Sequence, residues 1–131
     1  MPALCSRKGE VKYMLRTIQY SFPSKADGLE ISCLAVVPEL ERNEKYRGII
    51  QIVHGMSEYK ERYIPFMEYM AERKYISVIH DHRGHGKSVR SKEDLGYMYG
   101  GGAGAMPPDI HTGNCSIKAH FPGIPLVLFG H

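Results

Sequence analysis

The alternation of apolar and polar side chains predicts a two-stranded hairpin near the start of the chain. Over residues 16–22 the apolar side chains occupy every second position, which is the period of a strand with one buried face. The same period returns over residues 29–37, with Cys33 on the apolar side. The pair Asp27-Gly28 lies between them, and glycine accepts the positive φ of a tight reversal. We therefore expect an antiparallel hairpin, preceded by an N-terminal tail over residues 1–12.

Three later segments are almost entirely apolar, as in strands that are covered on both faces. They comprise residues 48–53, 76–79 and 125–129. Between the first two, apolar residues spaced i, i+3, i+4 and i+7 predict a helix over residues 62–74, with Pro65 in its first turn. Strands that alternate with helices behind a hairpin predict an α/β fold with parallel strands and crossover helices.

The connection before the last strand is harder to interpret. A crossover helix is needed there, but Pro107 and Pro108 are excluded from a helix interior, and Gly113 costs a helix about 1 kcal/mol relative to alanine. We expect a short or frayed helix that starts at Pro108 or Asp109. The preceding run Gly100–Gly104 follows no predicted strand and lacks a following Lys-Ser/Thr, so it is interpreted as a connector and not as a phosphate-binding loop.

Composition narrows the classes of function. The chain has 131 residues, of which 43% are hydrophobic and 24% charged, with a net charge of +3. These values are typical of one globular domain, whereas single domains with a large parallel sheet often need roughly 200–250 residues. The densest basic stretch, residues 83–92, lacks the interleaved aromatics of a nucleic-acid-binding face, so no nucleic-acid partner is expected.

Cysteine usage and hydropathy bear on the cellular compartment. Cys5, Cys33 and Cys115 are widely spaced, as expected for reduced thiols. The first twelve residues contain no signal-peptide core, and no apolar run reaches the roughly 18 residues of a membrane span. These features predict a cytoplasmic protein without a transmembrane segment.

Two of the buried strands end in motifs with possible chemistry. The first is followed by His54-Gly55-Met56-Ser57, where the glycine lets the backbone turn so that the next amide faces a reacting carbonyl oxygen. Sites in open α/β sheets assemble at the carboxyl ends of strands. An oxyanion-binding turn is therefore one interpretation of this motif, and a simple strand end is the other.

The second motif is Asp81–Ser88, a loop with two glycines that directly follows the second buried strand. His80, Asp81, His82 and His85 suggest a metal-dependent hydrolase, because imidazole and carboxylate are ordinary zinc ligands. His80 and His82 flank Asp81 in an extended segment, however, and no second ligand cluster follows. We favour a tight structural loop, with neither a metal nor a cofactor.

Together with the terminal strand, these motifs resemble the monoacylglycerol lipase and lysophospholipase branch of the α/β-hydrolases, which is grouped with the S33 serine aminopeptidase-like hydrolases. The matching pieces are residues 53–58, 62–63 with 66–71, 81–88 and 125–131, in the order and spacing of that branch. The resemblance implies that residues 13–131 form the N-terminal part of one α/β-hydrolase domain, an incomplete three-layer sandwich. The interrupted helix before the last strand departs from the regular helix of this branch.

The resemblance also implies roles for individual residues. The backbone N–H of Met56 would be one oxyanion donor, and Gly55 would shape the turn. The nucleophilic serine is expected immediately after His131, because Gly130-His131 begins a G-x-S-x-G motif. The acid, the base, the second donor and the cap are expected further on, so this chain alone is expected to be inactive. Site-adjacent structural roles are implied for His54, Asp81, Arg83, Gly84, His85, Gly86, Ser88, Gly130 and His131.

The activity that the resemblance implies is hydrolysis of a carboxylic ester such as a monoacylglycerol or a lysophospholipid. The substrate is thus a small acyl ester or lipid. The alternative is a truncated pseudo-hydrolase that acts as a binding or scaffold protein. In either case the last strand would present an exposed sheet edge, through which copies of the chain could associate.

Overall fold

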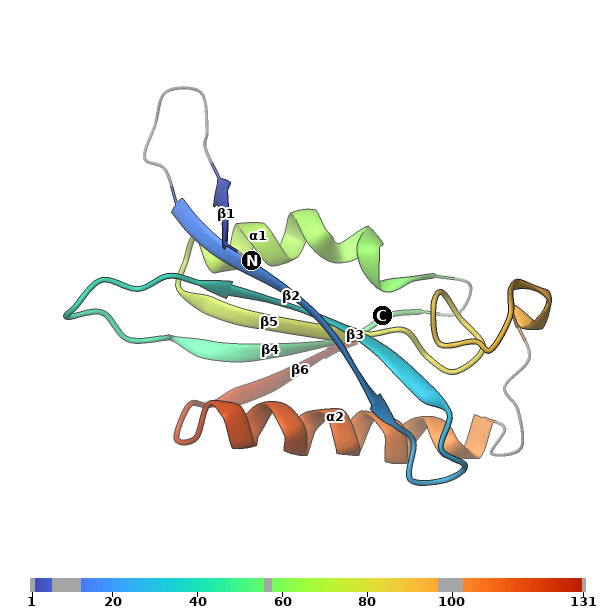
Figure 1. Ribbon diagram of the computed structural model, residues 1–131. Helices are drawn as coiled ribbons and strands as arrows, with labels where there is room; N and C mark the ends of the chain where they lie inside the picture. The colour runs from blue at the N-terminus through green and yellow to red at the C-terminus, as the bar shows by residue number, and fades with distance from the viewer. Residues whose placement is uncertain (1, 6–12, 56–57, 97–102, 131) are drawn as a thin grey trace.

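The computed structural model describes residues 2–5, 13–55, 58–96 and 103–130. Its centre is a six-stranded sheet with the order β1-β2-β3-β5-β4-β6 (Figure 1). The strands are β1 (Pro2–Cys5), β2 (Tyr13–Pro23), β3 (Glu30–Pro38), β4 (Gly48–Val53), β5 (Tyr75–His80) and β6 (Leu126–Gly130). The helices are α1 (Ile64–Ala71) and α2 (Met106–His120), with short 3₁₀ turns η1 (Lys60–Tyr63), η2 (Lys92–Asp94) and η3 (Ala103–Ala105).

The strand pairing confirms the predicted α/β architecture. β2 and β3 form the antiparallel hairpin, and β3 is also antiparallel to β5. From there the sheet is parallel: β4 pairs with β5 on one side and with β6 on the other. The chain runs from β4 through α1 to β5, and from β5 through α2 to β6, as expected for crossover connections.

The expected N-terminal tail is corrected in one respect, because it contains a strand. β1 is antiparallel to the first residues of β2, with Pro2 opposite Arg16 and Cys5 opposite Tyr13. The start of β2 offers backbone N–H and C=O groups on its outer side, and β1 pairs with them. A strand of four residues is too short for hydrophobic periodicity to reveal it.

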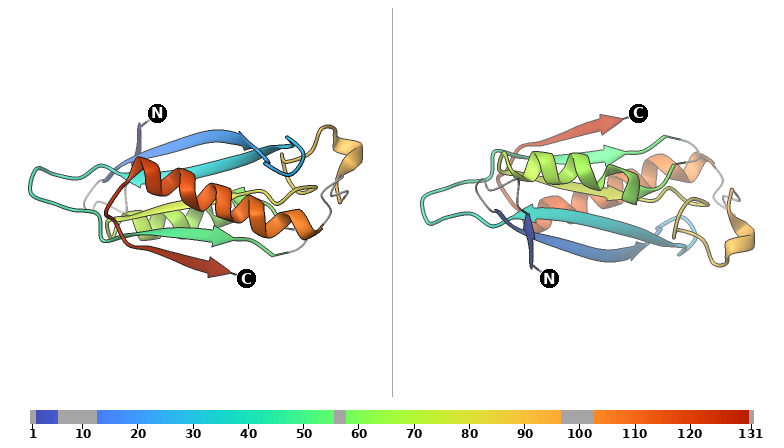
Figure 2. Two further views of the ribbon diagram at one scale, coloured as in Figure 1. Left: turned by 90° about the horizontal axis from the view of Figure 1, so that it is seen from below. Right: turned by 90° about the horizontal axis from the view of Figure 1, so that it is seen from above.

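The two helices cover opposite faces of the sheet, which gives three layers (Figures 1 and 2). Met67 and Ala71 of α1 belong to a core cluster with Leu34 and Val36 of β3. Ala35 and Val37, on the other face of the same strand, pack in the cluster that contains Ile117 of α2. β3 is therefore buried on both faces, and not on one as its alternating pattern suggested. Its Cys33 is buried, as predicted.

The first helix forms where the sequence places it, with different ends. The chain enters through η1, and α1 proper runs from Ile64 to Ala71, with Pro65 in its first turn. Residues 72–74 form a turn, and Lys74 adopts a positive φ of 71° that ends the helix. The predicted range of 62–74 thus covers a 3₁₀ turn, a helix and its terminating turn.

The expectation of a short or frayed second helix is wrong. α2 has 15 residues and begins at Met106, so that both prolines lie in its first turn. Its middle is fixed by Gln51 of β4: the Gln51 side-chain amide donates to the Ile110 carbonyl oxygen at 3.0 Å, and Asn114 Nδ2 donates to Gln51 Oε1 at 2.9 Å. These hydrogen bonds to the sheet offset the loss of helix stability that Gly113 causes.

Gly113 is expected to be replaceable, because a Cβ at this position would meet its nearest neighbours at ordinary contact distances of 3.5 to 3.8 Å. Gly113→Ala should raise the free energy of unfolding by about 0.5–1 kcal/mol, through helix propensity. Asn114→Ala should lower it by about 1 kcal/mol, because the hydrogen bond to Gln51 is lost. Urea denaturation of the two variants measures both effects. A destabilised Gly113→Ala variant would contradict this view of the helix–sheet contact.

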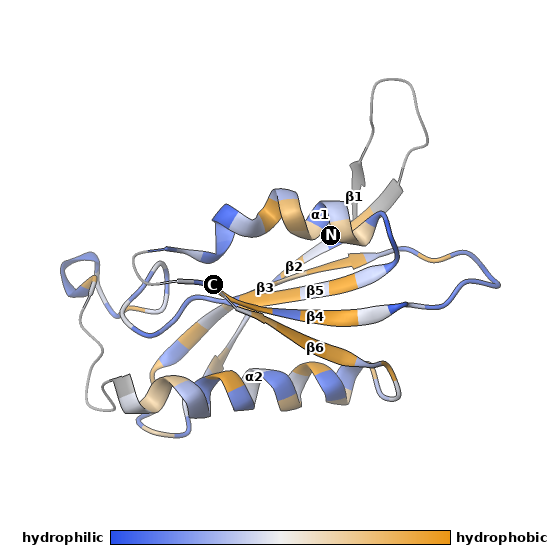
Figure 3. Ribbon diagram, turned by 180° about the vertical axis from the view of Figure 1, so that it is seen from behind, coloured by the Kyte–Doolittle hydropathy of each residue, from blue (hydrophilic) through white to orange (hydrophobic). Residues whose placement is uncertain are grey.

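The last strand is an apolar edge of the sheet (Figure 3). Val127, Leu128 and Phe129 are 57%, 59% and 46% exposed, and Phe66 of α1 stacks on Phe129 with ring centroids 5.2 Å apart. Exposed apolar edges invite pairing with another strand. The expected self-association through this edge stays a prediction.

Candidate active site

Two loops and the end of β6 lie together at the carboxyl ends of the parallel strands. In the sheet register, Val53 of β4 lies opposite Gly130 of β6, and Ile52 lies opposite Ile79 of β5. The turn that starts at His54, the loop that starts at Asp81 and the end of β6 therefore lie at one edge of the sheet. The sequence-predicted residues brought to this edge are His54, Gly55, Asp81, Arg83, Gly84, His85, Gly86, Ser88 and Gly130. Met56 and His131 lie outside the described residues.

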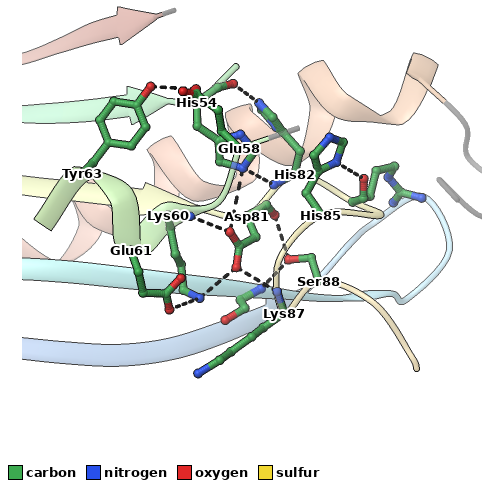
Figure 4. A network of polar contacts seen from close by, with 12 residues as sticks. His54, Glu58, Lys60, Glu61, Tyr63, Asp81, His82, His85, Lys87 and Ser88 are labelled. Atoms are coloured by element: carbon green, nitrogen blue, oxygen red, sulfur yellow. Dashed lines mark hydrogen bonds and ion pairs between the residues drawn. The ribbon is translucent and has the colours of Figure 1, made fainter. Parts of the chain in front are cut away.

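The His54 ring is fixed on both sides (Figure 4). Its Nε2 accepts the backbone N–H of His82 at 3.0 Å, so in the neutral ring the proton is assigned to Nδ1. That Nδ1 donates to the Gly55 carbonyl oxygen at 2.8 Å, and His82 Nε2 donates to the His54 carbonyl oxygen at 2.9 Å. His54 therefore joins the turn after β4 to the loop after β5.

Glu58 closes the turn after β4. Its Oε1 accepts the Gly55 N–H at 2.5 Å and the Tyr63 hydroxyl at 2.9 Å. The Glu58 N–H in turn lies 3.3 Å from the Gly55 carbonyl oxygen. Sequence analysis included this residue in the family motif but gave it no role. A carboxylate three residues after a turn glycine was the available signal, because it is within reach of that glycine's N–H.

Asp81 is completely buried and binds three nitrogens (Figure 4). Its Oδ1 accepts the Lys60 N–H at 2.7 Å, and its Oδ2 accepts Lys60 Nζ at 2.8 Å and the Lys87 N–H at 3.0 Å. Lys60, 1% exposed, also contacts Glu61 at 2.9 Å. Burial opposes its charge, but the bonds to Asp81 and Glu61 prevail and raise the pKa of Lys60. Sequence analysis missed this lysine.

The loop after β5 wraps around the Asp81 carboxylate. Gly86 has a positive φ of 49°, and a Cβ there would overlap the carboxyl group of Asp81. The Ser88 hydroxyl donates to the Asp81 carbonyl oxygen at 2.7 Å and accepts the Ser32 N–H at 2.9 Å. The tight loop inferred from the two glycines is thus held by one buried carboxylate and one buried hydroxyl.

Arg83 ties this loop to two distant elements. Its Nε donates to Asp109 Oδ2 in α2 at 3.0 Å, and its Nη1 donates to Asp27 Oδ2 in the hairpin turn at 3.0 Å. Ser24 accepts from Arg83 Nη2 at 2.9 Å and donates to Asp109 Oδ1 at 2.6 Å. The hydrogen bond from Arg83 lowers the pKa of Asp27 to about 2. These residues fix the hairpin, the β5 loop and α2 relative to one another.

Four histidines lie close together behind the loops. The rings of His54 and His82 are 4.3 Å apart, those of His80 and His82 5.4 Å, and those of His54 and His85 5.6 Å. Burial lowers the pKa of His80 to about 3 and that of His82 to about 4, and it also lowers the pKa of His54. Within the described ranges, no group of three or more His, Cys, Asp or Glu residues is arranged to hold a metal ion.

The buried histidines predict a loss of stability in mild acid. The pKa of His80 in the unfolded chain is near 6.5 and in the folded chain about 3, so below pH 6.5 the unfolded chain binds the extra proton. Stability should fall by about 1.4 kcal/mol per pH unit for each such histidine. The window runs from pH 6.5 to about 4 for His82 and to about 3 for His80, whereas Asp27 contributes a further loss only below about pH 3.8.

Urea denaturation at pH 7.5 and pH 5 measures this loss. In His80→Leu, the decrease in the free energy of unfolding between pH 7.5 and pH 5 should be about 2 kcal/mol smaller than in the unaltered chain. His120→Leu, at an exposed position of α2, is the matched control and should keep the loss unchanged. An unaltered loss in His80→Leu would show that His80 does not carry the effect.

An open groove adjoins the turn after β4. Its volume is about 460 Å³, and it is lined by Glu58, Tyr59, Gly84, His85, Gly86, Leu95 and Gly96. Tyr59 and Leu95 are exposed apolar side chains in its wall. The groove thus presents apolar surface beside the loops at the carboxyl ends of β4 and β5.

Comparison with known families decides the classification. The profile of the family described as serine aminopeptidase, S33, matches residues 44–131, which is more than half of the chain. The chain belongs to this family. The match begins before β4 and includes the turn after β4, the Asp81 loop and the end of β6.

Individual proteins are also similar to this chain. A monoglyceride lipase homolog of Monkeypox virus is 31% identical over 85 residues, which are 65% of this chain and 29% of that protein. A thermostable carboxyl esterase from Bacillus coagulans superposes with a TM-score of 0.77 at 29% identity, over 88% of this chain and 36% of that one. A soluble variant of monoglyceride lipase from Saccharomyces cerevisiae shares the fold, with a TM-score of 0.64 at 21% identity, over 100% of this chain and 39% of that one.

The chain thus belongs to the S33 serine aminopeptidase family, and its structure is the N-terminal part of an α/β-hydrolase fold. It spans about a third of the length of the relatives that it matches. In the described part of the chain, no helix combines the length and apolar character that a membrane span requires.

Proposed function

We propose that this chain is the N-terminal portion of a serine hydrolase that cleaves carboxylic esters, with monoacylglycerols or lysophospholipids as substrates. One observation carries the proposal: the register of β4 against β6 sets the His54-Gly55 turn beside Gly130. An oxyanion-binding turn and a nucleophile elbow have to be neighbours in this way, because both must reach the same acyl carbon. The likeness to a monoglyceride lipase homolog supports the choice of substrate.

In this mechanism the nucleophile is a serine that directly follows Gly130-His131. Its hydroxyl oxygen attacks the acyl carbonyl carbon, a histidine takes the hydroxyl proton, and the alcohol leaves with that proton. Water then attacks the acyl-serine, the histidine passes the water proton to the serine oxygen, and the carboxylic acid is released. The N–H of Met56 holds the negative oxygen of the tetrahedral intermediate. Losing one such donor costs an acyl-transfer enzyme about 2.7–4 kcal/mol of transition-state stabilisation.

The residues of this chain have supporting roles in the proposed reaction. His54, Asp81 and Arg83 hold the loops in place through buried hydrogen bonds and do not act as acid or base. Since nucleophile, acid and base are not among its residues, the 131-residue chain is inactive by itself. Cys33 and Cys115 are free thiols, which supports a reducing compartment such as the cytoplasm.

The proposal is tested by comparing ester hydrolysis by the 131-residue chain with that by a longer product of the same gene. The 131-residue chain should neither hydrolyse p-nitrophenyl butyrate or a monoacylglycerol nor react with a fluorophosphonate, which labels activated serines. A product that extends past His131 through a complete domain should do both, and replacing its first serine after His131 by alanine should abolish both. Serine-dependent turnover by the 131-residue chain, or an inert longer product, would contradict the proposal.

A further inference from the structure

We propose that Glu58, supported by Tyr63, is a positioning residue that sets the direction of the backbone at the end of β4. The proposal rests on the proposed function for the use of this turn, but its geometry is independent of any reaction. It also assigns the Gly55 N–H to the protein itself, so that this amide is not a donor to a substrate oxygen.

The Glu58 carboxylate connects two elements through one oxygen. Oε1 accepts the Gly55 N–H at 2.5 Å, at the end of β4, and the Tyr63 hydroxyl at 2.9 Å, at the end of η1 (Figure 4). Hydrogen bonds to an ionised acceptor are short and roughly twice as strong as those between neutral groups. Burial raises the pKa of Tyr63, and its bond to Glu58 acts in the same direction, so the phenol remains a donor. The turn is thereby tied to the residues that enter α1.

The other polar group of Gly55 is fixed as well. Its carbonyl oxygen accepts His54 Nδ1 at 2.8 Å and lies 3.3 Å from the Glu58 N–H. The His54 ring is in turn held by the His82 N–H. Because a peptide group is planar, fixing the Gly55 carbonyl fixes the orientation of the whole peptide group to which it belongs.

This arrangement explains why a glutamate stands three residues after the glycine. Without its carboxylate, the Gly55 N–H would lose its acceptor and would be free to turn toward solvent or substrate. Because Gly55 is only half-buried, its freed N–H can bond to water, and other conformations of this turn then become populated. Glu58 therefore acts on the reaction only through the backbone that it orients, and not by touching the substrate.

The Gly55 amide of the ¹⁵N-labelled 131-residue chain reports directly on this role. In Glu58→Ala its proton should shift upfield and exchange with solvent at least about tenfold faster, as expected when a charge-assisted hydrogen bond is lost. Glu58→Gln retains an acceptor oxygen and should restore exchange to within about threefold. Glu39→Ala, which removes an exposed carboxylate in the β3–β4 connection, is the control and should change neither quantity.

Tyr63→Phe is a second variant, which tests the role of the Glu58 carboxylate if Glu58→Ala fails to fold. It removes the Tyr63 donor to Oε1 and should accelerate Gly55 exchange by a few-fold, with a smaller shift than in Glu58→Ala. Unchanged Gly55 shift and exchange in these variants, or a Glu58→Gln variant as perturbed as Glu58→Ala, would overturn the proposal. Those outcomes would leave the proposed ester hydrolysis intact, since that is tested by turnover and by serine labelling.

Discussion

Replacing Gly86 with alanine is expected to lower the free energy of unfolding by about 2–5 kcal/mol. Two effects add at this position. A positive φ of 49° strains any residue with a Cβ, and the added Cβ would overlap the Asp81 carboxyl group. Asp81 cannot move aside, because its oxygens bind the Lys60 ammonium and the Lys87 N–H. Urea denaturation at pH 7.5 measures the loss.

Gly123→Ala separates the two effects. Gly123 has a positive φ of 82°, but no atom lies within 4 Å of a Cβ built there. It should therefore show only the backbone strain, about 1–2 kcal/mol. Equal losses in the two variants would mean that the Asp81 pocket tolerates the extra carbon and is less rigid than its hydrogen bonds indicate.

Replacing Arg83 with alanine should cost about 3–5 kcal/mol, the second large effect. The substitution leaves Asp109 buried without its cation and removes both bonds to Asp27. Since Ser24 and Asp109 remain hydrogen-bonded to each other, part of the network survives. The loss should be greater at neutral pH than in acid, because Arg83 lowers the pKa of Asp27 to about 2 and the stability from that pair disappears as the pH falls from 3.8 toward 2.

Arg73→Ala is the matched surface control. Arg73 is exposed, stacks on Tyr69 and donates to the Tyr69 carbonyl oxygen, so its removal should cost at most about 1 kcal/mol. Thermal unfolding monitored by circular dichroism compares the two variants. If Arg83→Ala unfolded at the temperature of Arg73→Ala, the buried arginine would not be what joins the hairpin to α2.

The parallel part of the sheet was predictable from sequence because its strands are short apolar runs between polar segments, a pattern that is typical of buried strands. Residues 48–53 and 76–79 are nearly all apolar, and each is followed at once by a glycine-containing polar motif. Carboxyl ends of parallel strands lie at one edge, so placing the strands also placed the motifs. The alternation in β3 was less informative, because the apolar residues between its expected core positions are buried by α1.

Helix α2 was misjudged because its stabilisation is not local. Pro107 and Pro108 are tolerated because the helix begins one residue earlier than Pro107, at Met106. Gly113 lowers the intrinsic helix propensity, which takes no account of contacts with the sheet. The compensating hydrogen bonds come from Gln51, more than fifty residues earlier in the chain. Only the folded sheet shows that this glutamine faces α2.

Lys60 and Glu58, two residues of the candidate site that sequence analysis passed over, illustrate the same limit. Lys60 looks like an ordinary solvated lysine in a polar stretch, and only the Asp81 carboxylate opposite explains its burial. Glu58 stood inside the family motif, but its partner Tyr63 belongs to the next element. Spacing along the chain indicates which nearby backbone groups a side chain can reach. Partners on other elements, such as Tyr63 for Glu58 or Asp81 for Lys60, depend on how the elements pack.

The central claim is that Gly130-His131 begins the elbow of a serine nucleophile beside the His54-Gly55 turn. Sequencing the transcript past the codon for His131 tests it most directly. We predict that the reading frame continues with Ser-x-Gly, which completes G-x-S-x-G and supplies the nucleophile that the neighbouring turn serves. A stop codon at that point, or a residue other than serine, would contradict the claim and favour the binding or scaffold alternative.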